Sequence, residues 1–125
     1  MNYEKLIQKT EVQIGSKTFC ISKIPAIEAT AIYPSVAKYY SDYGLLGLTM
    51  FDMELTKRIL SYTAAYNNGA WESLDLDSRI AQSLPDQSDL KKLTIMMVKE
   101  NWGFLTDGSL RDLLGLAEEA EESGS

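Results

Sequence analysis

The feature that most constrains the fold is the stretch from Pro85 to Leu105, PDQSDLKKLTIMMVKENWGFL. Pro85 followed by Asp86 is typical of a helix start, with Asp86 as the N-cap and the carboxylate of Asp89 near the free backbone N–H groups. The residues that follow are mostly apolar up to the end of the stretch. We therefore expect this segment to be the central helix of a small domain.

The apolar residues of this helix fall on two sides. One side carries Leu90, Leu93 and Met97, which follow the helical period. The other side carries Ile95, Met96 and Val98. A helix that is apolar nearly all round is buried in its own domain or covered by another chain. The second side is therefore a candidate for contact with other protein.

Length and charge limit what the rest of the chain can be. With 125 residues the chain makes one domain that needs neither metal nor disulfides to fold. No apolar run approaches the roughly 20 residues of a membrane span, and the charged N-terminal sequence lacks the apolar core of a signal peptide. We expect a cytoplasmic protein without a membrane partner. The net charge of −6, with no basic stripe, argues against nucleic-acid binding.

The residues that most catalytic and metal sites require are missing. The chain has no histidine, which excludes a Ser-His-Asp or Cys-His arrangement and the commonest metal ligand. Asp75 and Asp77 lack the glycine and the closing glutamate of a calcium loop, and no phosphate-binding glycine motif is present. The single cysteine, Cys20, excludes a disulfide framework and is interpreted as a small apolar filler. We expect no enzyme activity, no cofactor and no metal.

Residues 10–23 predict a β-hairpin. The runs TEVQI and KTFCI flank Gly15-Ser16, a two-residue connection in which glycine supplies the positive φ angle. The register expected from this loop is Ile14 opposite Lys17, Val12 opposite Phe19 and Thr10 opposite Ile21. This register places the apolar residues on one face, which must lie against helices or a partner.

The sequence from 25 to 69 predicts helices. Pro25 opens a first helix, which Pro34 ends because the residue before a proline is pushed out of the α region, and a second short helix then ends near Gly44. A third helix starts at a capping box of Thr49 and Asp52 and ends in Asn67-Asn68-Gly69. Its apolar stripe consists of Phe51, Leu55, Ile59, Tyr62 and Tyr66.

Two further helices flank the central one. Trp71 is expected in a loop, and a short helix beginning near Asp75 turns Leu76, Ile80 and Leu84 inward. After the central helix, Thr106-Asp107-Gly108 predicts a turn, and Ser109 starts a last helix. The inner side of this last helix carries Leu110, Leu113, Leu114 and Ala117. The glutamates of residues 118–125 oppose the helix dipole, so this end is expected to fray.

These elements predict a mainly α fold. It is a single domain over residues 1–125, with a β-hairpin at 10–23, a helical body of about five helices at 25–117 and an acidic tail at 118–125.

The apolar residues indicate binding rather than catalysis. Methionines at an adaptable surface suit the recognition of apolar segments, although core packing is the default for each one. A tyrosine-rich region around residues 33–43 is compatible with half-buried packing or with a protein-binding patch. The candidate protein-binding residues are Tyr39, Tyr40, Ile95, Met96, Val98 and Trp102.

Three stretches in this order resemble the tail assembly chaperones of long-tailed phages, which are encoded beside the tape measure protein. They are FCISKIPAIEATAIYP, LTMFDMELTKRILSYTA and LDSRIAQSLPDQSDLKKLTIMMVKENWGFLTDGSL. The last stretch ends in Asn101, Trp102 and Phe104 before Gly108, as the family pattern has an Asn and aromatic residues before a Gly-containing turn.

The resemblance implies a mainly α fold, self-association into a homo-oligomer, and binding to the tape measure protein and the tail tube protein. Such a chaperone keeps the tape measure protein soluble while tube subunits are recruited. It acts in the host cytoplasm and is absent from the mature virion. The family has no catalytic residues.

Two other readings stay open. One is a structural phage component, such as a head–tail or tail completion protein, which would remain in the particle. The other is a small acidic adaptor that acts on a host protein. A helix that is apolar on two sides and a solubilising net charge are compatible with all three.

Overall fold

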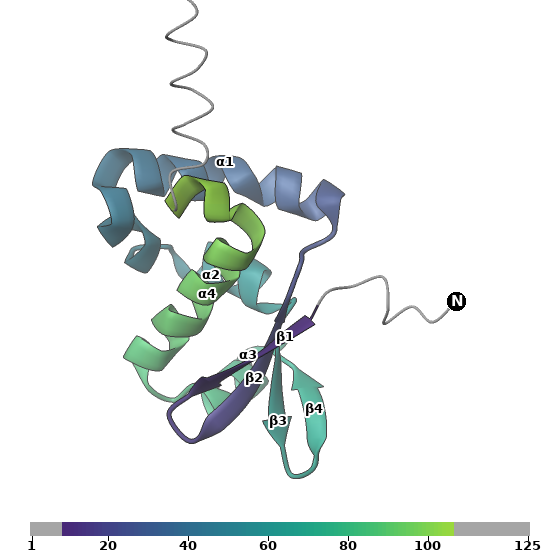
Figure 1. Cartoon of the computed structure of the whole chain (residues 1–125). Helices are drawn as coiled ribbons and strands as arrows, with labels where there is room; N and C mark the ends of the chain where they lie inside the picture. The colour runs from purple at the N-terminus through teal and green to yellow at the C-terminus, as the bar shows by residue number, and fades with distance from the viewer. Residues whose placement is uncertain (1–8, 107–125) are drawn as a thin grey trace, which may run out of the picture.

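The computed structural model describes residues 9–106, and these form a small α/β domain. Four antiparallel strands make one sheet in the order β1-β2-β3-β4, and the helices lie above it and to one side (Figure 1). The expectation of a mainly α fold with one hairpin was wrong, because residues 64–73 add a second hairpin to the first. The predicted last helix and the tail at 118–125 lie outside the described residues.

The first hairpin has the predicted register. β1 (Lys9–Ile14) pairs with β2 (Lys17–Ser22), and Val12 lies opposite Phe19. Gly15 has a φ of 62° in the connecting turn, as the two-residue loop requires. The face that carries Ile14, Phe19 and Ile21 is buried, because α4 packs against both strands.

The second hairpin replaces the end of a predicted helix. β3 (Ala64–Asn67) and β4 (Ala70–Ser73) are joined by Asn68 and Gly69, whose φ angles are 52° and 83°. Two consecutive positive φ angles define the type I′ turn, for which Asn-Gly is the preferred sequence. The predicted helix therefore does not reach Tyr66, and Trp71 lies in β4 rather than in a loop.

The first helix is longer than predicted. α1 (Ala26–Tyr43) follows Pro25 and continues through Pro34, so the two helices expected here are one. Proline removes the N–H that would bond to the carbonyl of Thr30, and that residue is exposed, so water can take the place of the missing donor. Burial of Ile32 and Val36 on either side of the proline favours the continuous helix.

The predicted cap of the next helix lies three residues too early. A 3₁₀ turn, η2 (Gly44–Thr49), precedes α2 (Met53–Leu60). The N-cap of α2 is Asp52, whose carboxylate accepts a hydrogen bond from the N–H of Leu55 at 2.8 Å. The hydroxyl of Thr49 donates to the carbonyl of Leu46 instead of capping α2.

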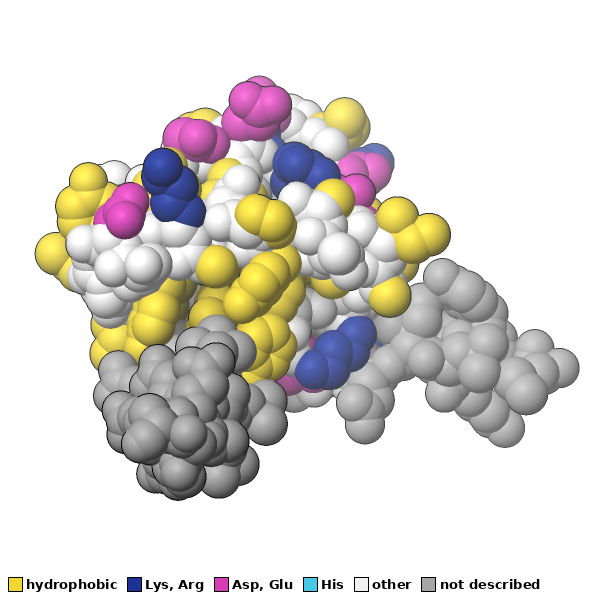
Figure 2. Space-filling view, turned by 90° about the horizontal axis from the view of Figure 1, so that it is seen from above, with side chains coloured by type: hydrophobic (Ala, Val, Ile, Leu, Met, Phe, Trp, Pro, Cys, Tyr) yellow, Lys and Arg dark blue, Asp and Glu magenta, His cyan; other side chains and the backbone are white. Residues whose placement is uncertain are grey.

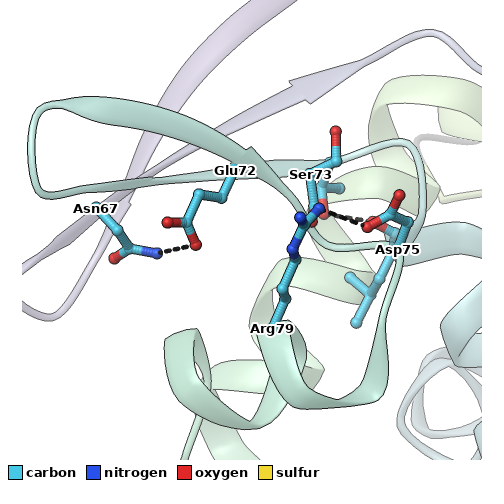
Figure 3. Close-up of polar contacts among 7 residues, drawn as sticks. Asn67, Glu72, Ser73, Asp75 and Arg79 are labelled. Carbon is cyan, nitrogen blue, oxygen red and sulfur yellow. Dashed lines mark hydrogen bonds and ion pairs between the residues drawn. The ribbon is translucent and has the colours of Figure 1, made fainter.

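An ion pair lies at the entry to α3 (Asp77–Ser83). Arg79 Nη1 lies 3.0 Å from Asp75 Oδ1 and also donates to the carbonyl of Ser73 (Figure 3). Asn67 donates to Glu72 across the second hairpin. The N-cap residue of α3 is Leu76 and no side chain caps the helix, so the carboxylate of Asp75 pairs with Arg79 instead of capping α3. Of the three residues expected inward, Ile80 and Leu84 are buried, whereas Leu76 is exposed.

The central helix lies where it was predicted. α4 (Gln87–Thr106) begins after Asp86, whose carboxylate accepts from the N–H of Ser88 at 2.9 Å. Its buried side is wider than the sequence pattern indicated, since Val98 is as fully enclosed as Leu93 and Met97. The backbone departs from helical angles at Trp102, close to the end of the helix.

Asn101 connects α4 to the segment between β2 and α1. Its Oδ1 accepts from the N–H of Ile24 at 2.6 Å, and its Nδ2 donates to the carbonyls of Ser22 and Met97 at 3.1 and 3.0 Å. All three hydrogen bonds are partly buried. The amide therefore satisfies backbone groups that would otherwise lack partners in this connection.

Replacing Asn101 with alanine is expected to lower the free energy of unfolding by about 2 kcal/mol, because backbone groups of Ser22 and Ile24 lose their partner. Chemical denaturation of both proteins measures the difference. The matched control is Lys99→Ala on the exposed side of the same helix. Equal stabilities of the two variants would contradict the assignment.

Candidate protein-binding surface

Large apolar side chains are exposed around η2. Tyr43, Leu45, Leu46, Met50 and Met53 are between 43% and 66% exposed, and they follow one another within eleven positions of the chain. We call these five residues the η2 surface. An exposed apolar cluster on a small domain typically marks an interaction site.

The backbone of η2 is tightly packed although its leucines face the solvent. Gly47 lies so close to α1 that a Cβ atom there would be 2.1 Å from the carbonyl oxygen of Tyr39. Leu48 is buried beneath the turn. Lys91 of α4 donates to the carbonyl of Thr49 at 2.5 Å. These contacts hold Leu45 and Leu46 on a rigid support, which lowers the entropy lost on binding.

An apolar groove borders the η2 surface. It runs between α2 and the start of α4, with Leu48, Phe51 and Met53 on one side and Leu84, Pro85 and Leu90 on the other. The groove continues past Met53 toward Ile80 of α3. We call it the α2–α4 groove. Because Met53 belongs to both features, the η2 surface and the groove can contact one ligand together.

The charged groups at the α2–α4 groove are engaged within the domain. Lys57 Nζ forms an ion pair with Asp77 at 3.2 Å, and Lys91 bonds to a backbone carbonyl of η2. The groove therefore offers mainly apolar contacts with few free charges, which suits an apolar polypeptide segment more than a charged small molecule.

The six residues predicted from the sequence as protein-binding lie in two environments. Val98 and Trp102 are buried, so they act in core packing and could reach a partner only if α4 moved. The remaining four are half-buried and pack against the core: Tyr39, Tyr40, Ile95 and Met96. The structure brings Tyr39 next to the α2–α4 groove, since its ring lies 5.1 Å, between centroids, from that of Phe51, which lines the groove. The role of these residues in binding stays a prediction.

The most exposed residues of the site escaped the sequence analysis. Leu45 and Leu46 are adjacent in GLLGL and follow neither a helical nor a strand period, so no pattern assigned them to a face. The signal available was the glycine on either side, which indicates an irregular turn between two helices. Met50 and Met53, in contrast, are methionines, the residue type that the sequence analysis linked to the recognition of apolar segments.

A smaller exposed pair lies on the outer face of the sheet. Tyr66 and Trp71 face each other across the second hairpin with ring centroids 5.2 Å apart and an interplanar angle of 66°. Both are partly exposed, and they stabilise the hairpin as an edge-to-face pair. The cross-strand contact accounts for these aromatics without a ligand.

The sheet's outer face also carries Cys20, which is half-buried. The pKa of the Cys20 thiol is raised, chiefly because burial disfavours the charged thiolate. The nearby charge of Lys9 lowers this pKa in part, and the charge of Glu11 raises it. We expect slower alkylation in the folded protein than in denaturant at the same pH, because less thiolate is present. The folded state favours the protonated thiol. The contribution of Cys20 to the free energy of unfolding is therefore fully present below the ordinary thiol pKa of about 8.5, and it is lost as the pH rises through the raised pKa. Equal alkylation rates in both states would contradict the burial.

A second groove lies between α1 and the end of α4. It is lined by Ala26, Ala29 and Tyr33 of α1 and by Trp102 and Phe104 of α4. We call it the α1–α4 groove. Figure 2 views the molecule from the side of α1 and shows hydrophobic side chains gathered near the middle of this face.

Two kinds of site have no counterpart among residues 9–106. No group of three or more cysteine, aspartate or glutamate side chains is arranged to hold a metal ion. Within the same range, no helix has both the length and the apolar character that a membrane crossing demands.

Comparison with known proteins identified no relative of this chain. A scan against protein-family models and searches of curated proteins and of solved structures found no match. The surface itself is therefore the basis for a functional hypothesis.

Proposed function

We propose that this protein is a non-catalytic binding protein that holds an apolar segment of another protein on the η2 surface and in the α2–α4 groove. The observation that carries the proposal is the set of five large apolar side chains exposed around one rigid turn. Burying such residues against a partner is the main source of binding free energy in protein interfaces.

The partner we propose is the tape measure protein of a long-tailed phage, so the protein would be a tail assembly chaperone. The support is the sequence resemblance given above, together with an exposed surface suited to an apolar polypeptide. The tape measure protein, as a long client of the chaperone, needs its apolar segments bound until the tube subunits surround it. In this proposal the chaperone works in the host cytoplasm, forms a homo-oligomer and leaves before the virion is complete.

Co-expression with the tape measure protein of the same phage tests this function. The expected result is a larger soluble fraction of the tape measure protein and its co-purification with this chain. An unchanged soluble fraction would remove the proposal. Detection of this chain in purified virions would instead favour a structural tail or head–tail component.

The double variant Leu45→Asp/Leu46→Asp should bind the client at least about thirtyfold more weakly, a loss of roughly 2 kcal/mol, because two exposed anchors become charged. Isothermal calorimetry or a pull-down with the purified client measures the change. The matched control is Ile27→Asp, which places the same charge on a side chain that is 89% exposed on α1. Equal binding by both variants would exclude the η2 surface as the site.

A further inference from the structure

We propose that the peptide between Asn68 and Gly69, at the tip of the second hairpin, is a site of spontaneous deamidation. In this modification the side-chain amide of an asparagine is converted to a carboxylate, with water as the only co-reactant. The two residues belong neither to the η2 surface nor to the α2–α4 groove, so the inference is independent of the proposed function. It rests on the sequence at the turn, on its exposure and on its backbone geometry.

Asn68 is the only asparagine in the chain that a glycine follows. Deamidation begins when the backbone nitrogen of the next residue attacks the side-chain carbonyl carbon, Cγ. A glycine has no side chain to obstruct this approach, and its backbone rotates more freely than that of other residues. The other asparagines, Asn2, Asn67 and Asn101, are followed by tyrosine, asparagine and tryptophan, whose side chains hinder the attack.

The structure leaves the reacting groups of Asn68 and Gly69 accessible. Both residues are exposed, and no atom lies within 4 Å of the place where a side chain on Gly69 would begin. The side-chain amide of Asn68 has no hydrogen-bond partner among residues 9–106. In contrast, Nδ2 of Asn67 and Nδ2 of Asn101 each donate two hydrogen bonds. Of the asparagines in this range, Asn68 is therefore the one whose side chain is free to rotate toward the backbone.

The reaction passes through a cyclic imide. The nitrogen of Gly69 forms a bond to Cγ of Asn68 while the bond from Cγ to Nδ2 breaks, and the proton of the Gly69 N–H leaves with Nδ2 as ammonia. Water then adds to one of the two carbonyl carbons of the ring, breaks the bond between that carbon and the Gly69 nitrogen, and returns a proton to the nitrogen. Opening at Cγ gives aspartate, whereas opening at the main-chain carbon gives isoaspartate, whose backbone runs through Cβ.

The turn controls the rate at which this ring closes. Asn68 has a φ of 52°, which suits the first central residue of both the type I′ and the type II′ turn. The two types differ in the ψ of that residue, which is about 30° in type I′ and about −120° in type II′. At the first value the Gly69 nitrogen points away from Cβ, whereas at the second it eclipses Cβ and can reach Cγ. Ring closure therefore requires a flip of the peptide plane, which the pairing of β3 with β4 resists.

Isoaspartate at this position would weaken the contact between the hairpin and α3. It adds one atom to the backbone of the two-residue turn, which can then no longer hold Asn67 opposite Ala70. Nδ2 of Asn67 donates to Oγ of Ser83 at 3.0 Å, and Ser83 is a buried residue at the end of α3. We expect this hydrogen bond to be lost in the isoaspartate form.

Mass spectrometry of the full-length protein tests the site. The protein is kept at mildly alkaline pH, either folded or unfolded in guanidinium chloride, and is then digested with trypsin. The peptide from Ile59 to Arg79 contains Asn67 and Asn68 and no other amide side chain, so its mass and fragmentation identify the converted residue. In the folded protein we expect Asn68 to react at least about tenfold faster than Asn67 and Asn101, and about tenfold more slowly than in the unfolded chain.

Conversion of Asn67 or Asn101 as fast as Asn68 in the folded protein would overturn the inference, because the exposed turn would then have no special reactivity. An intact Asn68 amide in the folded protein, after about ten half-lives of the unfolded chain, would also overturn it. Equal rates at Asn68 in the folded and unfolded chains would show that the turn does not control ring closure.

Hydrogen exchange tests the consequence for α3. The isoaspartate form, isolated by chromatography, should exchange the amide protons in the last turn of α3 about tenfold faster than the unmodified protein. The matched control is freshly prepared Asn68→Asp, which adds the same charge without the extra backbone atom and keeps a sequence favoured in type I′ turns. This variant should exchange at the rate of the unmodified protein. Equal exchange in the isoaspartate form and in the control would overturn the coupling of the turn to α3.

Discussion

Replacing Gly47 with alanine is expected to lower the free energy of unfolding by about 3 kcal/mol. The added Cβ would lie 2.1 Å from the carbonyl oxygen and 2.7 Å from the carbonyl carbon of Tyr39. Both atoms belong to the backbone of α1, so neither can move aside as a flexible side chain could. Either η2 shifts away from α1 or the helix deforms. Thermal unfolding should show a midpoint lower by roughly 10–20 °C.

The control for Gly47 is Gly15→Ala. Gly15 has a φ of 62° with nothing within 4 Å of an added Cβ, so alanine meets conformational strain but no overlap. Its expected effect is about 1 kcal/mol. If both substitutions destabilise equally, the close approach of η2 to α1 is wrong. A displaced η2 should also weaken client binding in Gly47→Ala, whereas Gly15→Ala should bind normally.

Replacing Met97 with aspartate is expected to unfold the protein. The side chain of Met97 is completely buried, so the change removes apolar contacts and places a charge in the core. The combined effect is about 5 kcal/mol or more, which approaches the whole stability of a typical domain. Circular dichroism should show loss of helix and strand signal at 25 °C.

Met53→Asp is the matched control for Met97→Asp. Met53 is 52% exposed and opens α2, where a negative charge interacts favourably with the helix dipole. The expected change in stability is below about 1 kcal/mol. Client binding should nevertheless fall, because Met53 belongs to both the η2 surface and the α2–α4 groove. Similar unfolding of both variants would contradict the different burial of the two methionines.

The sequence predicted the elements whose local signals agree with each other. The first hairpin has the expected register because its two-residue loop and its apolar alternation give the same pairing. The start of α4 was correct because Asp86 has no competing role. In both cases the deciding interactions lie within a few residues along the chain.

The second hairpin was missed because its signals support two structures. Asn68-Gly69 suits both a helix C-terminus and a type I′ turn, and the spacing of Tyr62 and Tyr66 continues the helical stripe of α2. Pairing of Ala65 with Phe19 decides between them, and those residues are far apart in sequence. The single helix through Pro34 has a similar cause, since core burial of Ile32 and Val36 outweighs the local preference.

The candidate surface was only partly predictable. Composition indicated apolar binding, yet it directed attention to α4, whose Val98 lies in the core. None of the large exposed apolar residues within 9–106 lies on that helix. Exposure of Leu45 and Leu46 follows from the approach of Gly47 to Tyr39, a tertiary contact that no periodic pattern contains.

The amide of Asn101 has a consequence for folding during synthesis. It bonds to Ser22 and Ile24, which leave the ribosome nearly eighty residues earlier. At 5–20 residues per second, the first hairpin waits several seconds or longer before α4 can cover its apolar face. A nascent chain stalled before this point would expose Phe19 and Ile21 to proteases and to the general folding factors of the cell.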